Sequence, residues 1–394
     1  MDLNSFLTHF ECSHCTKRFP THANPAFCQS CKAPLLARYD LSRLGAQVSK
    51  DKIIAQNSSG ILRWKELLPL ENSNHIISLG EGNSPLLHLS TLSTKFGFDH
   101  LYLKDEGRNP SGSFKARGFS VAVSKAIENQ HQKLILPSAG NAGSALAIYA
   151  ARANIQAKII MPKSTPMAMI AECKAAGAEV ILIDGSITDC GMHADEIAMA
   201  EGWHLLSTFK EPYRLEGKKT MGYELAVHFH WETPSVIIFP TGGGTGLVGI
   251  WKAFTELIEL GWITNKALPK MVAVQASGCA PLVRAFLNGA DVSEPWPDPY
   301  TIASGLQVPS SFASRLILKI IRETSGYCIA VEDTEIIKAQ RELGQVEGLA
   351  VSPEGAASLA GAIHLLEKNL IQTDDIVVIF NTASAVKYMA SDRE

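Results

Sequence analysis

From about residue 100 onward, short apolar runs alternate with longer, helix-type stretches. The runs are apolar on both faces, and enough residues separate them for a crossover helix, which is typical of parallel strands buried between helices. We expect such strands at 101–104, 134–137, 158–161, 180–184, 236–239, 271–274 and 376–380. The pattern therefore predicts an α/β fold with mostly parallel sheets.

The first 40 residues form a different kind of segment. They lack periodic apolar runs and are rich in Cys, His, Pro and Thr, so we expect a small separate module. The whole chain of 394 residues is 46% hydrophobic and exceeds the size at which one core stops growing. Two globular domains, or one with an appendage, are expected, and the segment 289–309 is the most loop-like.

Net charge, apolar runs and cysteine content indicate the kind of partner and the cellular location. A formal net charge of -3 without long runs of one sign disfavours nucleic acid or a membrane as the main partner and favours a small molecule. The first ten residues do not resemble a secretion signal, and no stretch reaches about 18 uninterrupted apolar residues. Four of the eight cysteines are scattered through helix- and strand-like segments. A soluble protein of the reducing cytoplasm fits best.

The other four cysteines form two Cys-x-x-Cys pairs. Cys12 and Cys15 form the first pair, and Cys28 and Cys31 form the second. Four thiolates suit tetrahedral zinc, and a module this small needs a bound metal to fold. The alternatives are a degenerate ribbon without metal and a redox pair. Because cysteines fill all coordination positions, we expect a closed structural site.

A glycine- and serine-rich turn places Lys115 at the start of a helix-like stretch, 119–127. A lysine amine forms imines with aldehydes, and small neighbours let a flat cofactor approach the backbone. The alternative is an ordinary turn that ends in a solvated lysine.

Three further segments follow predicted strands. Thr241–Gly246, with the sequence TGGGTG, joins a strand to a helix and exposes N–H groups suited to a phosphate; the alternative is a flexible turn. The segment 138–143 opens a second helix, at 144–151, whose N-terminus suits a carboxylate, although helix capping explains it equally well. Asn381–Ser384 places hydroxyls at the carboxyl end of a strand, where ligands of open α/β sheets bind, although a plain N-cap is the commoner meaning of such residues.

Taken in order, these motifs resemble those of the fold-type II pyridoxal-phosphate enzymes, the tryptophan synthase β-like group, and most of all those of threonine synthases. The segments 79–86, 104–118 and 212–218 are similar to that family's opening, lysine and substrate-phosphate segments. The resemblance covers about residues 75–390. It implies a zinc ribbon at 1–40, a large cofactor-binding domain at 41–118 and 207–394, and a small α/β domain at 119–206. A homodimer is also implied.

The resemblance implies roles for individual residues. Lys115 would be the Schiff-base lysine and the base at Cα, Asn141 the partner of the cofactor's phenolic oxygen, and Thr382 the partner of its ring nitrogen. The cofactor phosphate would lie against Gly242, Gly243, Gly244, Thr245 and Gly246. The substrate carboxylate would meet the N–H groups of Ser138, Ala139 and Gly140, and Lys104 and Arg214 would bind a substrate phosphate. Glu354 is a further candidate for the pocket, or a carboxylate at a helix N-terminus.

The implied activity is conversion of O-phosphohomoserine and water to threonine and phosphate, by γ-elimination and β-addition. Ala116 stands where threonine synthases usually have aspartate, and it and the glycine run are also similar to serine and threonine ammonia-lyases. A lyase of that kind is the first alternative. A catalytically inert zinc-ribbon binding protein is an alternative from another class.

Overall fold

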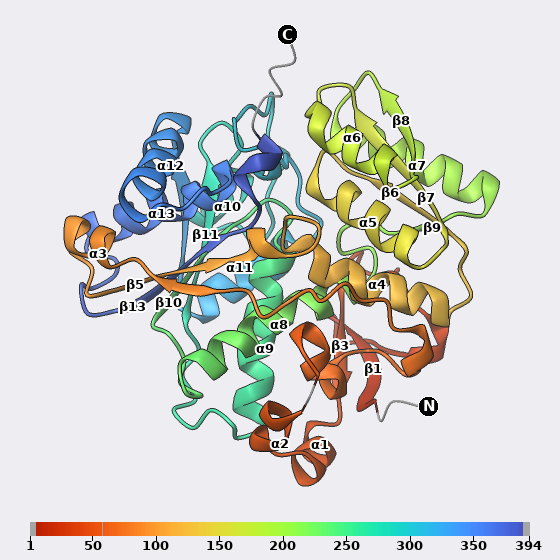
Figure 1. The fold of residues 1–394 in the computed structure, drawn as a ribbon, viewed down its shortest axis with the longest axis horizontal. Helices are drawn as coiled ribbons and strands as arrows, with labels where there is room; N and C mark the ends of the chain where they lie inside the picture. The colour runs from red at the N-terminus through yellow and green to blue at the C-terminus, as the bar shows by residue number, and fades with distance from the viewer. Residues whose placement is uncertain (1–4, 57, 389–394) are drawn as a thin grey trace. The chain divides into compact units, whose positions relative to one another are not determined.

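The structure, a computed structural model, describes residues 5–56 and 58–388 and divides into two compact units (Figure 1). The first unit contains the described residues up to Asn83 together with Asn109–Thr220. The second contains Ser84–Arg108 and the described residues from Met221 onward. The boundary between them at Thr220 falls within one helix, α8 (Tyr213–His228).

The second unit is built on a six-stranded sheet in the order β12-β11-β10-β13-β5-β4. All neighbouring strands are parallel except the edge pair β4 and β5. The strands are β4 (Leu86–His88), β5 (His100–Asp105), β10 (Val236–Pro240), β11 (Lys270–Ala276), β12 (Tyr327–Val331) and β13 (Ile376–Asn381). The helices are α3 (Ser90–Phe96), α9 (Thr245–Glu259), α10 (Pro281–Leu287), α11 (Ser314–Glu323), α12 (Asp333–Glu347) and α13 (Pro353–Glu367), with short 3-10 turns at Glu106–Arg108, Ser304–Leu306 and Ala385–Tyr388.

Both faces of this sheet are covered. Alternate side chains of β10, such as Val236 and Ile238, belong to a core that includes residues of α3, α12 and α13. Ile237 and Phe239 point to the other face and are equally buried. Burial on both faces explains why the strands read as continuous apolar runs in the sequence.

The first unit contains a four-stranded parallel sheet in the order β8-β7-β6-β9. Its strands are β6 (Lys133–Pro137), β7 (Gln156–Pro162), β8 (Glu179–Ile183) and β9 (His204–Leu205). Its helices are α4 (Lys115–Glu128), α5 (Asn141–Arg152), α6 (Met167–Ala175) and α7 (Ile187–Glu201). Residues of α4, α5 and α6 share one core with this sheet, and α7 packs separately against Ile135 and Ile160.

The N-terminal part of this unit is a three-stranded antiparallel sheet in the order β2-β1-β3. Its strands are β1 (Leu7–Cys12), β2 (Arg18–Pro20) and β3 (Leu35–Tyr39), with a 3-10 turn at Thr21–Ala23. Two short helices follow, α1 (Leu41–Gln47) and α2 (Lys50–Ala55), and then 3-10 segments at Gly60–Leu67 and Ser73–His75. We call residues 5–39 the N-terminal module.

The seven predicted strands are all present. Strand β12 was missed, as were the short strands β4 and β9 and the strands of the N-terminal module. The division of the chain also differs from the expected one, because 41–83, 109–118 and 207–220 group with the small sheet. Among the described residues, no helix is long and apolar enough to span a membrane.

Candidate functional site

Lys115 is the first residue of α4, so the helix begins four residues earlier than expected. Its side chain is half-buried, and its Nζ lies 4.1 Å from the centre of the Phe114 ring. The Nζ of Lys218, on α8, lies 5.4 Å from the centre of the same ring. Burial, followed by the positive charges of Arg214 and Lys115, holds the pKa of Lys218 well below its usual range. Sequence reasoning treated Lys218 only as the end of a motif, and missed that it lies near Lys115.

Arg214 belongs to the same cluster in the first unit. Its Nε donates to Glu211 Oε1 at 2.6 Å, and its guanidinium lies 5.1 Å from the centre of the Phe119 ring. Only 2% of the residue is exposed, and the backbone N–H groups of Tyr213 and Arg214 also donate to Glu211. Glu211, which the sequence did not single out, therefore fixes the first turn of α8 and orients the guanidinium.

The segment after β6 forms a helix start, as predicted. Ser138 Oγ accepts the N–H of Gly143 at 2.8 Å and that of Gly140 at 3.2 Å, and α5 begins at Asn141. The N–H of Ser138 itself donates to the Ile160 carbonyl at 3.0 Å. The N–H groups of Ser138 and Gly140 thus have partners within the chain, and a substrate carboxylate would compete with these.

In the second unit, the glycine loop joins β10 to the N-terminus of α9, and Gly244 has a left-handed φ of 87°. A methyl group on Gly242 would lie 2.5 Å from the Gly305 carbonyl oxygen, and one on Gly246 would lie 2.1 Å from the Phe239 ring. The Thr241 hydroxyl donates to the Phe239 carbonyl at 2.7 Å, so it faces the loop's own backbone. This close packing leaves backbone N–H groups at the start of a 15-residue helix as the donors for an anion.

Thr382 follows β13 directly and is 5% exposed. The preceding residue, Asn381, donates to Asp105 Oδ1 at 2.7 Å and accepts the N–H of Ser352, the N-cap of α13, at 3.1 Å. Glu354, in the first turn of α13, accepts the N–H of Gly305 at 2.7 Å. The glycine loop, Thr382 and Glu354 therefore lie at the carboxyl edge of one sheet, where ligands of open α/β sheets bind.

Lys104, on β5, is 3% exposed and has partners inside the second unit. Its Nζ donates to the Ser84 carbonyl at 2.6 Å and to Glu224 Oε2 at 2.7 Å. This ion pair neutralises the lysine, so it is a weaker candidate for a phosphate than its sequence position indicated.

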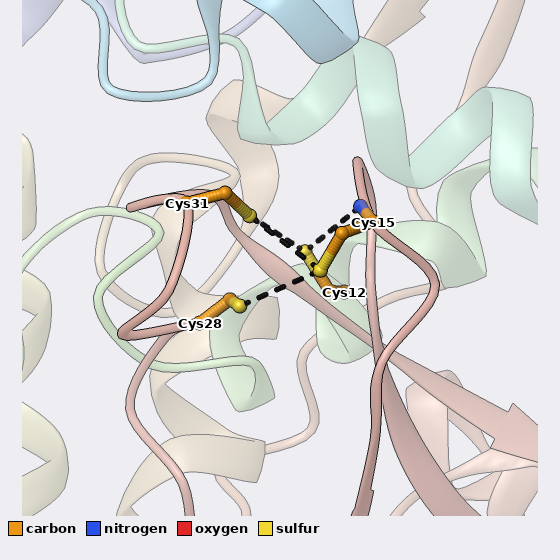
Figure 2. A group of neighbouring side chains, drawn as sticks. All are labelled: Cys12, Cys15, Cys28 and Cys31. Atoms are coloured by element: carbon orange, nitrogen blue, oxygen red, sulfur yellow. Dashed lines mark hydrogen bonds between the residues drawn. The ribbon is translucent and has the colours of Figure 1, made fainter.

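The four clustered cysteines converge in the N-terminal module (Figure 2). Their sulfur atoms all lie within 4.8 Å of one another. Individual Sγ to Sγ distances are 3.3 Å for Cys12 and Cys31, 3.7 Å for Cys15 and Cys31, and 3.8 Å for Cys15 and Cys28. A tetrahedral zinc with bonds of about 2.3 Å requires sulfur separations of about 3.8 Å. The cluster therefore has the dimensions of a four-thiolate metal site.

Comparison with known proteins identifies the family of the chain. The profile of the family described as "Pyridoxal-phosphate dependent enzyme" matches residues 77–382. The chain is 34% identical to the threonine synthase of Methanosarcina acetivorans over 380 residues, which cover 96% of this chain and 92% of that protein. The chain belongs to the pyridoxal-phosphate-dependent enzymes and, within them, to the threonine synthase group. It is also 33% identical to the threonine synthase of Methanocaldococcus jannaschii, over 95% of this chain and 92% of the relative.

Solved structures agree on the fold. Maize serine racemase matches with a TM-score of 0.66 and 22% identity, over 77% of this chain and 88% of that one. Threonine deaminase isoform 2 of Solanum lycopersicum matches with a TM-score of 0.66 and 24% identity, over 76% of this chain and 79% of that one. The α/β architecture with parallel and mixed sheets is thus that of the fold-type II enzymes.

Proposed function

We propose that the protein converts O-phosphohomoserine and water to threonine and phosphate. The observation that carries the proposal is the identity to curated threonine synthases over almost the whole chain, together with the basic cluster around Arg214. Guanidinium groups bind phosphate in a bidentate manner, and this one is held in place by Glu211.

We assign pyridoxal phosphate as the cofactor and propose which residues would hold it. Lys115 would be the amine that binds it, Asn141 would contact its phenolic oxygen, Thr382 its ring nitrogen, and Gly242–Gly246 its phosphate. Two observations support the assignment: the packing at Gly242 and Gly246 leaves no room for side chains, and the glycine loop and Thr382 share one sheet edge. The bound cofactor supplies an electron sink for the Cα–H bond of the amino acid.

The remaining steps use the chain's own groups. The Lys115 amine would take the proton from Cα. For phosphate to leave Cγ, a proton must also leave Cβ, and water then adds at Cβ to give threonine. Arg214 would bind the departing phosphate, and the segment Ser138–Gly140 would bind the substrate carboxylate. The Thr382 hydroxyl, a neutral partner, would leave the ring nitrogen unprotonated and so favour elimination and replacement over transamination.

A substrate panel on one preparation tests the proposal. O-phosphohomoserine should give equal amounts of phosphate and threonine, whereas serine and threonine should give little keto acid.

Arg214→Lys keeps the charge but removes the bidentate geometry, so KM for O-phosphohomoserine should rise at least tenfold. Lys104→Met combined with Glu224→Leu removes the other candidate cation without leaving a buried charge, so it is the matched variant and should change KM less. Deamination of serine or threonine without phosphate release would instead support the ammonia-lyase, the alternative that the sequence left open. A protein that neither binds pyridoxal phosphate nor turns over any of these amino acids would be the inert binding protein.

We further propose that Cys12, Cys15, Cys28 and Cys31 hold a structural Zn²⁺, since their sulfur spacing fits tetrahedral thiolate coordination. Metal analysis of the purified protein should give one zinc per chain, and a value near zero would contradict this. A homodimer in the cytoplasm completes the proposal, and sedimentation analysis tests the dimer.

A further inference from the structure

The N-terminal module contacts the first turns of α8, the helix that carries Arg214. The Phe10 ring lies edge-on against Tyr213, with 5.7 Å between ring centres. The Tyr213 hydroxyl donates to Asn24 Oδ1 at 2.6 Å. Both contacts reach the residue directly before Arg214.

A second set of contacts lies one turn further along the helix. The Tyr39 hydroxyl donates to Glu216 Oε2 at 2.7 Å. Glu216 pairs with Lys219 at 2.6 Å, and neither side chain is exposed. The Lys219 Nζ also lies 4.0 Å from the centre of the Tyr39 ring. Residues 213, 216 and 219 are spaced by three, so they lie along one side of the helix.

Other residues of α8 contact α4, which begins at Lys115. Arg214 and Lys218 lie over the rings of Phe119 and Phe114, and Thr220 accepts from Arg117 at 2.9 Å. The two helices are in close contact, because a methyl group on Gly217 would lie 1.9 Å from the Arg117 carbonyl oxygen. Helix α8 is therefore held by the N-terminal module and by α4, and its first turn cannot shift without breaking one set of contacts.

The position of Asn24 depends on the cysteine cluster. Asn24 lies between the two cysteine pairs, four residues before Cys28, and it has a left-handed φ of 43°. The stretch between β2 (Arg18–Pro20) and Cys28 contains only the 3-10 turn Thr21–Ala23, none of whose residues is buried. A strand of the N-terminal sheet bounds it at one end and a cysteine of the cluster at the other, so both boundaries constrain the position of Asn24.

A hollow of about 360 Å³ adjoins this contact, with Asn24, Phe27, Lys210, Glu211 and Tyr213 among its lining residues. Glu211, the partner of Arg214, is thus part of the same surface as Asn24. Displacement of Asn24 would open the hollow toward Glu211 and loosen the first turn of α8 from that side.

We propose that the metal at the four-cysteine cluster positions Arg214 through Asn24 and Tyr213, so that metal occupancy sets the affinity of the enzyme for the phosphate of its substrate. Asn24 and Tyr213 are positioning residues in this scheme. The inference rests on the proposed function for the role of Arg214 as the phosphate ligand and for the metal at the four cysteines. Thermodynamic linkage makes the effect reciprocal, so phosphate binding should also raise the affinity for the metal by the same factor.

The test measures the binding of inorganic phosphate to the cofactor-loaded enzyme by calorimetry, before and after removal of the metal by a chelator. Metal removal should weaken phosphate binding at least tenfold, raise KM for O-phosphohomoserine by a similar factor and leave kcat within about twofold. Hydrogen exchange should quicken at 22–28 and 213–217. Unchanged phosphate affinity in a metal-free protein whose 22–28 segment exchanges faster would overturn the inference, as would absence of phosphate binding to the metal-loaded enzyme.

Variants at Asn24 test the same link without removing the metal. Asn24→Gly keeps the left-handed backbone and removes the acceptor, so phosphate should bind about threefold to tenfold more weakly, as expected for one hydrogen bond. Asn24→Asp keeps an oxygen acceptor and should restore most of the affinity. Equal phosphate affinity in Asn24→Gly and the parent would refute the role of Asn24. Because phosphate binding is measured without turnover, failure of the proposed reaction is seen separately in the substrate panel.

Discussion

Gly242→Ala tests whether the glycine loop binds the cofactor phosphate. The new methyl group would lie 2.5 Å from the Gly305 carbonyl oxygen and 2.8 Å from Val308 Cγ2, both far inside van der Waals contact. The Gly305 turn is held from its other side, since Glu354 accepts the Gly305 N–H at 2.7 Å. The glycine loop must therefore move by roughly 1 Å to relieve the overlap, which is enough to break a hydrogen bond.

The loss can be estimated from that one bond. A hydrogen bond from a backbone N–H to a charged phosphate contributes about 1.5–3 kcal/mol, so pyridoxal phosphate should bind roughly 10-fold to 150-fold more weakly. Titration of the cofactor-free protein with pyridoxal phosphate, followed by absorbance, measures the dissociation constant. Pyridoxal without phosphate provides the decisive comparison, because its affinity should change much less.

Gly191→Ala is the matched control. Gly191 lies inside α7, and a methyl group there would meet nothing within 4 Å. This variant should bind the cofactor as the parent does and gain up to about 1 kcal/mol of stability, the usual difference between glycine and alanine in a helix. If Gly242→Ala weakened pyridoxal and pyridoxal phosphate equally, the loop would not be the phosphate site.

Three other predictions follow from single contacts. Borohydride reduction should fix the cofactor covalently to the parent but not to Lys115→Ala; label found on another lysine by peptide mapping would contradict the assignment. Glu224→Leu should cost about 3–5 kcal/mol in urea unfolding because it leaves the ammonium of Lys104 buried, whereas Lys104→Met combined with Glu224→Leu should cost less than the single change. His204 stacks on His131 at 4.0 Å, and burial, then the charge of His131, lowers its pKa from 6.5 to about 4. Below pH 6.5 the unfolded chain therefore binds more protons than the folded one. The contribution of His204 to the free energy of unfolding should be complete above pH 6.5 and fall by up to about 3 kcal/mol as the pH drops to 4. Thermal unfolding at the two pH values measures this loss, and His204→Gln should reduce it.

The sequence predicted the strands well because burial on both faces leaves a local signal. The run at 236–239, for example, is entirely apolar, and β10 has no exposed residue. Edge strands leave a weaker signal: β4 has three residues and β9 two, and all five are partly or fully exposed. The helix starts after β6 and β10 were also local, since serine and glycine there serve turns and N-termini.

Long-range pairings could not be read in the same way. Nothing near Lys104 indicates that Glu224, 120 positions away, is its partner. The grouping of 41–83 with the small sheet depends on contacts of the same kind, such as the pair of Lys125 with Glu71 at 2.6 Å. Composition gives no sign of them, because charged residues in a connecting segment look the same whether they are paired or solvated.

The same reasoning changes the meaning of Ala116. In the sequence, alanine at the position where threonine synthases usually have aspartate left an ammonia-lyase open as the alternative to a threonine synthase. In the structure it is fully buried in the apolar core of the first unit, with Phe119 and Val123 on the same helix. A carboxylate there would need a buried partner, so alanine at 116 is explained by packing. In the function proposed above, discrimination between phosphorylated and unphosphorylated amino acids would depend on Arg214, its partner Glu211 and the contacts that position them. Those contacts come from the N-terminal module, a part of the chain that the cysteine spacing marked only as structural.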